Sequence, residues 1–137
     1  MTTVDISTNA RLVQDWARLL SPHELDSLLQ LFTDDVIYED VTLGAVNVGK
    51  EALRAFAENF LLAFPDVTLE LSSTFTTATH GGAEWVMRGT QASDLPELPA
   101  TGKRMALRGA SMFEFADGKI RRVSDYWDRA NLLEQLR

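Results

Sequence analysis

The second half of the chain alternates apolar and polar residues, and this pattern limits the fold more than any other feature. Four stretches share the alternation: residues 67–77, 83–91, 103–115 and 119–127. A period of two is typical of strands that bury one face. Turn-forming residues separate the stretches, namely Gly81-Gly82, a loop over 92–102 with Pro96 and Pro99, and Asp117-Gly118. The sequence therefore predicts a run of strands joined by hairpins.

The first half of the chain instead repeats apolar residues at helical spacing. One helix face is predicted from Leu12, Trp16, Leu19 and Leu20. Ser21-Pro22 is typical of a helix start, so a second helix is expected from there to the Asp34-Asp35 pair. A third helix is expected over 50–64, where an apolar stripe ends at Phe64.

The remaining segments complete the predicted order of elements. A short strand is expected over 36–41, a loop over 43–49, and a tail or helical turn over 130–137. This order predicts one α+β domain over residues 1–137, with helices on one face of a mostly antiparallel sheet. A strongly curved sheet with about three helices on its concave side forms a cone, and its open mouth suits a small-molecule pocket.

Composition narrows the chemistry. The chain has no cysteine and only two histidines, His23 and His80, so neither a thiolate nucleophile nor a metal site is expected. Its net charge of −7 argues against nucleic-acid binding. A polar N-terminus over residues 1–9 and the lack of a long apolar run predict a cytoplasmic protein that crosses no membrane. An enzyme without a cofactor, which is what we expect, would depend on carboxylates.

Two aspartates lie on predicted apolar strand faces. Asp40 shares a face with Val36 and Tyr38, and Asp125 lies between Val123 and Trp127. A carboxyl group in an apolar pocket has a raised pKa, which suits acid–base catalysis. The alternative for Asp40 is a capping residue for the following turn. Asp128 is a second candidate on the last strand, although it could instead cap a C-terminal helical turn.

Several segments together resemble the SnoaL-like polyketide cyclases and ketosteroid isomerase relatives of the nuclear transport factor 2-like superfamily. The segments are residues 31–40, 49–53, 63–66, 88–90, 99–103, 117–120 and 128–136. The resemblance implies the cone-shaped fold and places Asp40 at the general base of ketosteroid isomerases. Trp16 and Ser111 stand where those enzymes carry the Tyr and Asp of their oxyanion hole. In SnoaL-like cyclases a carboxylate on the last strands does the acid–base work, which implies Asp125.

The segment 125–128 also resembles the last strand of limonene-epoxide-hydrolase-type enzymes. That resemblance implies that Asp125 activates water and that Tyr38 and Asp40 help to hold it. Arg88 would orient the acids, whereas Thr90 replaces the Asp that protonates the epoxide. If Arg88 faces Asp125, it should lower the pKa of Asp125 and leave Asp40 as the acid with the higher pKa. The alternative for Arg88 is an exposed strand residue paired with Glu70 or Glu114.

These considerations predict catalytic roles for Asp40, Asp125 and Arg88. The residues predicted to contact substrate are Trp16, Tyr38, Phe60, Phe64, Thr90, Ser111 and Trp127. The leading hypothesis is a cofactor-independent cyclase or isomerase acting on an apolar, carbonyl-bearing small molecule. An epoxide hydrolase and a non-catalytic binding or assembly domain are the alternatives. An inward Arg88 would also place Trp85 and Met87 on the outer sheet face, where they predict a homodimer.

Overall fold

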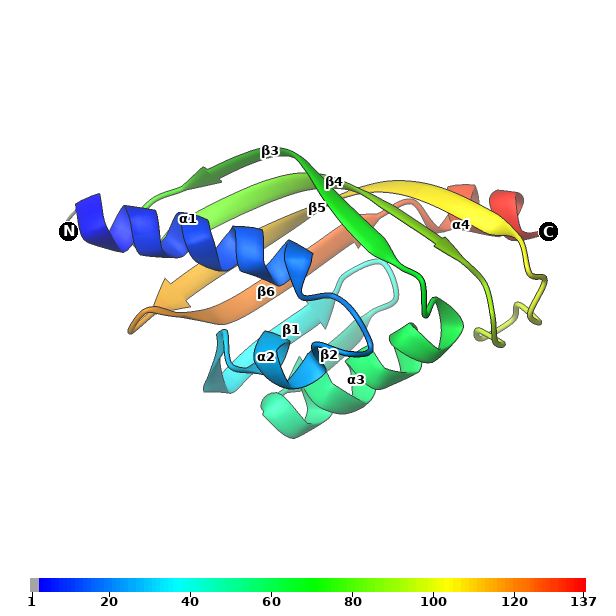
Figure 1. The fold of residues 1–137 in the computed structure, drawn as a ribbon, viewed down its shortest axis with the longest axis horizontal. Coiled ribbons are helices and arrows are strands. Elements are labelled where there is room, and N and C mark those ends of the chain that lie inside the picture. The colour runs from blue at the N-terminus through cyan, green and yellow to red at the C-terminus, as the bar shows by residue number, and fades with distance from the viewer. Residues whose placement is uncertain (1–2) are drawn as a thin grey trace.

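The computed structural model describes residues 3–137 of the chain, so Met1 and Thr2 of the polar N-terminus lie outside the described residues. Its elements are α1 (Thr3–Arg18), α2 (Leu25–Leu29), β1 (Phe32–Asp40), β2 (Ala45–Val48), α3 (Lys50–Ala63), β3 (Thr68–Thr76), β4 (His80–Thr90), β5 (Arg104–Ala116), β6 (Lys119–Trp127) and α4 (Arg129–Leu136). Figure 1 shows these elements as one curved sheet with helices against it. The predicted α+β fold is confirmed.

The six strands form one sheet in the order β2-β1-β6-β5-β4-β3. Neighbouring strands are antiparallel except β1 and β6, which run parallel. The helices α1, α2 and α3 lie on the concave side (Figure 1), α1 against β3 and α3 against β1 and β2. The parallel pair therefore joins the first strand to the last in the interior of the sheet.

The strands bury every second side chain on this concave side. Val36 and Val123 are fully buried there, and Phe113 on β5 packs its ring edge-on against Trp16 of α1 at 5.0 Å between centroids. Burial of apolar side chains between a sheet face and its helices is the main stabilising contribution to such a fold. The predicted alternation of β1 and β6 is therefore confirmed.

The second helix is much shorter than predicted. It covers only Leu25–Leu29, because Ser21 forms a turn in which its Oγ accepts from the His23 N–H at 3.3 Å. Phe32, expected on the helix, begins β1 and is 1% exposed beside Ile120 of β6. Apolar residues three and four positions apart fit a helix, but this short run continues directly into a buried strand, and burial decides the outcome.

Two further boundaries differ from the prediction. The expected loop over 43–49 contains a short edge strand, β2, that pairs with β1. Gly81 and Gly82 lie inside β4 rather than in a turn, because the turn is closed earlier by the Thr77 N–H bonding to the His80 carbonyl at 2.7 Å. A side chain at Gly82 would overlap the Phe75 ring, so the glycine permits a close approach and not a turn.

The C-terminal segment forms a helix of its own, α4, against the end of β5. Gln135 bonds to the free edge of that strand: it accepts from the Ala106 N–H at 2.8 Å and donates to the Ala106 carbonyl at 2.9 Å. Its amide thus takes the place of a neighbouring strand, since an unpaired strand edge leaves backbone groups unsatisfied. No helix within residues 3–137 is long and apolar enough to span a membrane.

Candidate active site

A cavity of about 510 Å³ lies between the concave sheet face and the helices. Its wall is mostly apolar. The aromatic side chains that line it include Trp16, Tyr38, Phe56, Phe60, Phe64 and Trp127. The volume and lining are typical of a pocket for a small, mainly apolar molecule.

Asp40 and Asp125 are direct neighbours in the lining of this cavity. They are paired residues on the parallel strands β1 and β6, and both line the cavity. Adjacent strands lie about 4.8 Å apart, so the two carboxyl groups project side by side from the same sheet face. Hydrogen bonds just beyond the pair hold the strands in this register: the Val41 N–H bonds to the Asp125 carbonyl at 2.9 Å, and Thr42 Oγ1 bonds to both the N–H and the carbonyl of Trp127.

Asp40 is held mainly as a hydrogen-bond acceptor. The Trp127 Nε1–H donates to its two oxygens at 3.1 and 3.0 Å, and the Leu43 N–H donates to Oδ1 at 3.0 Å. The residue is only 6% exposed. Burial raises the pKa of Asp40, and the hydrogen bonds from Leu43 and Trp127 oppose that rise. The alternative role as a turn cap is present as well, through the bond to Leu43.

Asp125 is the more strongly perturbed acid. Its Oδ1 accepts a 2.6 Å hydrogen bond from the Ser111 hydroxyl, and Tyr38 provides a second side-chain hydrogen bond. Burial, together with a smaller contribution from the charge of the nearby Asp40, raises the pKa of Asp125 to about 7 against the lowering effect of these bonds. At neutral pH the group can therefore either release or accept a proton.

Tyr38 connects Asp125 to the first helix. The tyrosine makes side-chain hydrogen bonds with both Asp125 and Trp16. Burial, together with the charge of Asp125, raises the pKa of Tyr38 well above its usual value of 10.0, so the hydroxyl keeps its proton. The indole of Trp16 can only donate, which leaves the Tyr38 proton for Asp125.

Arg88 does not lie in the cavity, and the expectation that it faces Asp125 is wrong. Its guanidinium lies 3.8 Å from Glu70, and its side chain is 51% exposed. Thr90, two residues further on the same strand, also lies outside the cavity lining, and its N–H bonds to Asp66 at 2.8 Å. The predicted order of acidities is reversed as a result: among the groups of residues 3–137 that shift the pKa of Asp125 there is no cation, and this pKa is the strongly raised one.

The inward-facing residues of β4 are Trp85 and Met87, which are 5% and 9% exposed and line the cavity. They do not form the outer patch on which the homodimer prediction was based. Exposed apolar side chains outside the cavity include Phe75, Met112 and Tyr126. The homodimer remains a prediction, and the residues on which it was based lie on the inner face of the sheet.

Two other predicted residues have structural roles. Ser111 is fully buried and absent from the cavity wall, so it acts on Asp125 from behind and not on a substrate. Asp128 caps α4, with its side chain accepting from the Asn131 N–H at 3.1 Å. That contact confirms the capping alternative for Asp128.

Sequence reasoning missed one wall of the cavity. Leu95, Pro96 and Leu98, in the connection between β4 and β5, line it together with Leu132 and Leu133 of α4. An ion pair at 2.8 Å between Glu97 and Arg129 links the connection to the helix. The sequence signal for this wall is the pair of leucines beside the prolines, Leu95 and Leu98, in an otherwise polar loop.

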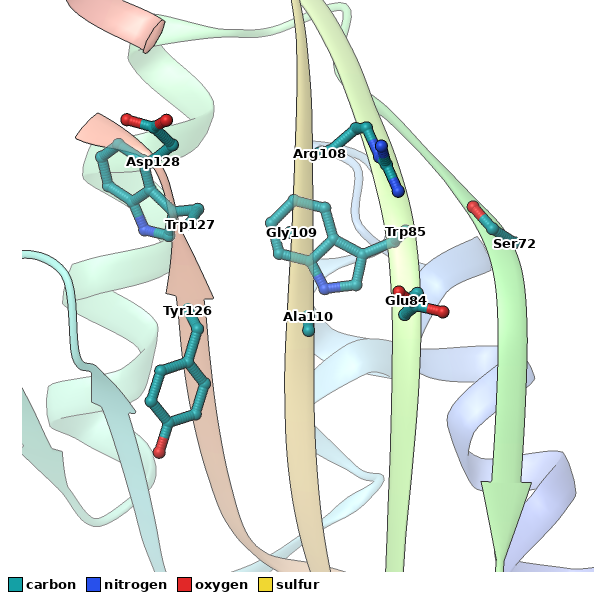
Figure 2. Close-up of a pocket in the computed structure, with 9 residues that line it drawn as sticks. All are labelled: Ser72, Glu84, Trp85, Arg108, Gly109, Ala110, Tyr126, Trp127 and Asp128. Carbon is teal, nitrogen blue, oxygen red and sulfur yellow. The ribbon is translucent and has the colours of Figure 1, made fainter. Parts of the chain in front are cut away.

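A second, shallow depression lies on the sheet and includes side chains from the uncovered face, shown in Figure 2. Ser72, Glu84, Arg108 and Tyr126 border it, and the Trp85 indole lies at Gly109 behind β5 (Figure 2). Trp85 and Trp127 line both this depression and the cavity. Among residues 3–137, no group of three or more His, Asp or Glu residues is arranged to hold a metal ion.

Comparisons with known proteins agree with this architecture. The family model of the SnoaL-like polyketide cyclases matches residues 10–136. Cyclase aurE of Calcarisporium arbuscula is 28% identical over 123 residues, which is 89% of this chain and 88% of that protein. A protein of Xanthomonas campestris pv. campestris with a provisional polyketide cyclase assignment has a crystal structure that superposes with a TM-score of 0.85, at 22% identity over 97% of this chain and 99% of the other. A phenazine biosynthesis-related protein of Pseudomonas aeruginosa superposes with a TM-score of 0.82, at 23% identity over 96% and 86%.

Proposed function

The chain belongs to the SnoaL-like polyketide cyclase family, and we propose that it is a cofactor-independent enzyme that cyclises or isomerises a carbonyl compound. The observation that carries this proposal is the pair of neighbouring carboxyl groups, Asp40 and Asp125, in the wall of a mostly apolar cavity. One of the two is set to hold a proton near neutral pH and the other to accept one. That combination is what proton transfer at a carbon beside a carbonyl requires.

The hydrogen bonds assign the starting roles. Asp40 receives N–H donors from Trp127 and Leu43, which favour its ionised form, so it acts as the base. Asp125, whose pKa is near 7, carries the proton and acts as the acid. Asp40 takes the proton from the carbon next to a carbonyl, and the resulting enolate attacks a second carbonyl of the same molecule. A carbon–carbon bond forms, and Asp125 gives its proton to the oxygen of the attacked carbonyl.

The balance of this step needs no co-reactant. One proton moves from carbon to Asp40 and another from Asp125 to oxygen. After the step the pair of aspartates still holds one proton, which is now on Asp40 and no longer on Asp125. The two groups are neighbours and can exchange the proton directly or through water, which restores the starting state. In an isomerisation the same pair would return the proton to a different carbon of the enolate.

Trp16 and Ser111 stand where a ketosteroid isomerase carries its two oxyanion-hole donors, but both already donate hydrogen bonds to other side chains. Trp16 bonds to Tyr38, and the Ser111 hydroxyl donates to Asp125. A neutral Asp125 is therefore the donor to a developing oxyanion that the site offers best. The epoxide hydrolase alternative is less well supported, because Arg88 is exposed beside Glu70 and Thr90 lies outside the cavity lining.

The test is a substrate panel of ring-closing diketones, enones that can isomerise, and epoxides. Wild type, Asp40→Asn and Asp125→Asn are compared with Asp35→Asn, an exposed aspartate on the same strand as Asp40. We expect turnover of the diketones or enones that falls by about 10²–10⁴ in the two site variants and stays unchanged in the control. Turnover of epoxides alone would establish the hydrolase, and ligand binding without turnover of any substrate would establish a binding domain.

A further inference from the structure

A chain of buried hydrogen bonds reaches Asp125 through Ser111, a residue that is not part of the cavity lining. The Trp85 Nε1–H donates to Ser111 Oγ at 2.9 Å, and the Ser111 hydroxyl donates to Asp125 Oδ1 at 2.6 Å. Ser111 is 0% exposed and Trp85 is 5% exposed, so bulk water does not compete for these bonds. In such surroundings each bond is stronger than its counterpart on the surface.

The chemistry of the indole fixes the direction of this chain. An indole N–H can only donate, so Ser111 Oγ must be the acceptor in the first bond. A serine hydroxyl has one proton and two lone pairs; Trp85 takes one lone pair, and Asp125 Oδ1 is the acceptor that lies within reach of the proton of this fully buried group. Its one proton therefore points to Asp125 Oδ1 in both protonation states of the acid.

This direction decides where Asp125 carries its own proton. Oδ1 already receives the Ser111 proton, so the Ser111 contact favours Oδ2 for the proton of the neutral acid, on a carboxyl that also has a side-chain hydrogen bond with Tyr38. We propose that Trp85 and Ser111 are positioning residues that hold the exchangeable proton of Asp125 on the oxygen that Ser111 leaves free, where a substrate in the cavity can take it. Neither residue touches the reacting atoms in this scheme.

The neighbouring strand is built to admit the indole. Gly109 on β5 pairs with Trp85 on β4, and a Cβ at Gly109 would overlap the six-membered ring of the indole. Figure 2 shows the Trp85 ring crossing β5 at Gly109. The absence of a side chain there lets Trp85 lie across β5 and reach Ser111, two residues further along that strand.

This inference deepens the proposed function and rests on it only for the statement that the proton is transferred to a substrate. The arrangement itself is tested without any substrate. The measurement is a pH titration of the side-chain carboxyl carbon of Asp125 by ¹³C NMR, assigned by its loss in Asp125→Asn. It compares wild type with Ser111→Ala, Trp85→Phe, the double variant and the control Ser124→Ala, which removes a hydroxyl next to Asp125 on the opposite sheet face.

Loss of a hydrogen bond to the charged form should make Asp125 a weaker acid. We expect its acid dissociation constant to fall about 3- to 30-fold in Ser111→Ala and by a smaller factor in Trp85→Phe, with no change in Ser124→Ala. Because Trp85 acts through Ser111, the double variant should titrate like Ser111→Ala alone. An unchanged titration in Ser111→Ala, or a Trp85→Phe effect that persists in full when Ser111 is absent, would overturn the proposal.

A second variant covers the case in which Trp85→Phe does not fold. Incorporation of 3-benzothienylalanine at position 85 keeps the bicyclic shape and replaces the N–H by sulfur, so it removes only the donor. It should weaken the acid in the same direction as Trp85→Phe. An unchanged titration in this variant would refute the role of the indole N–H.

Activity measurements separate this inference from the proposed function. Once a substrate that the wild type converts has been found, Ser111→Ala should lower kcat more than it raises KM. It should also move the pH–rate profile to higher pH. If the titrations change as expected but no carbonyl substrate reacts, the proposed function fails and the proton placement stands. If Asp125→Asn abolishes turnover but the titration ignores Ser111, the proposed function stands and the placement fails.

Discussion

The raised pKa of Asp125 predicts that this protein becomes less stable as the pH rises toward neutrality. Its carboxyl has a pKa of about 7 in the folded state against an ordinary value of 3.8. Between these values the unfolded chain is ionised at this position while the folded chain is protonated. The folded state therefore binds one more proton, so its free energy of unfolding falls as pH increases through this window and levels off above about pH 7.

The size of the effect follows from the same two values. One pKa unit corresponds to about 1.4 kcal/mol, so the full difference amounts to about 4 kcal/mol of lost stability. Asp125 faces a cavity that admits water, which makes about 4 kcal/mol the upper value and about 2 kcal/mol a reasonable lower one. Either value is a large part of the stability of a small domain.

Asp125→Asn removes the ionisation and nearly preserves the shape. Urea unfolding at about pH 5 and about pH 8.5 should show a clear decline for the wild type and a much smaller one for the variant. Part of the loss has already occurred at about pH 5, so if the two proteins have similar stability there, the variant should be more stable by about 1–3 kcal/mol at about pH 8.5. Asp40, whose pKa is also raised by burial, accounts for a small remaining decline in the variant.

Asp35→Asn serves as the control for the loss of one negative charge, because Asp35 is exposed on β1. It should keep the wild-type dependence on pH. Equal stability of the wild type at both pH values would refute the assignment of a neutral, buried Asp125. So would a full wild-type decline in Asp125→Asn, since the proton would then belong to another group.

Three further predictions follow from contacts around the site. Gly109→Ala places a methyl group against the Trp85 ring and should lower the free energy of unfolding by about 1–3 kcal/mol, measured by urea denaturation. Gln135→Ala removes two hydrogen bonds to the Ala106 backbone and should cost about 1–3 kcal/mol, with faster amide exchange at Ala106 as the specific sign that the strand edge has opened. Arg88→Ala should leave both the Asp125 titration and turnover unchanged, because Arg88 is exposed beside Glu70, and a shift in either would place the guanidinium in the site after all.

Much of the fold could be predicted from the sequence because local patterns and burial agree. The alternation around Val36, Tyr38 and Asp40 assigns these residues to one face whatever the rest of the chain does. The same rule places Asp125 with Val123 and Trp127. The predicted length of the second helix was wrong because apolar residues three or four positions apart suit either a helix or the start of a strand. Only the contact of Phe32 with β6 decides between the two.

The site was harder to predict because alternation gives two faces without saying which one is buried. For β4 the choice lay between Trp85 with Met87 and Arg88 with its polar neighbours. Burying a guanidinium without a partner is costly, so the apolar pair turns inward and Arg88 pairs with Glu70 at the surface. The order of the pKa values of Asp40 and Asp125 depended on that choice and on Ser111. The contact between Ser111 and Asp125 joins two strands, so no pattern within one stretch of sequence predicts it.

The parallel pairing of β1 with β6 also determines when this protein can act during its own folding. Asp40 and Asp125 become neighbours only after the last strand has docked beside the first, with β2, α3 and the hairpins of β3, β4 and β5 lying between them in the chain. Closing so long a loop is slow compared with forming a hairpin. A folding intermediate that already contains β3, β4 and β5 would therefore have a partial cavity wall but no acid pair. The acid pair, and any proton transfer that depends on it, therefore forms only when the last strand has completed the sheet.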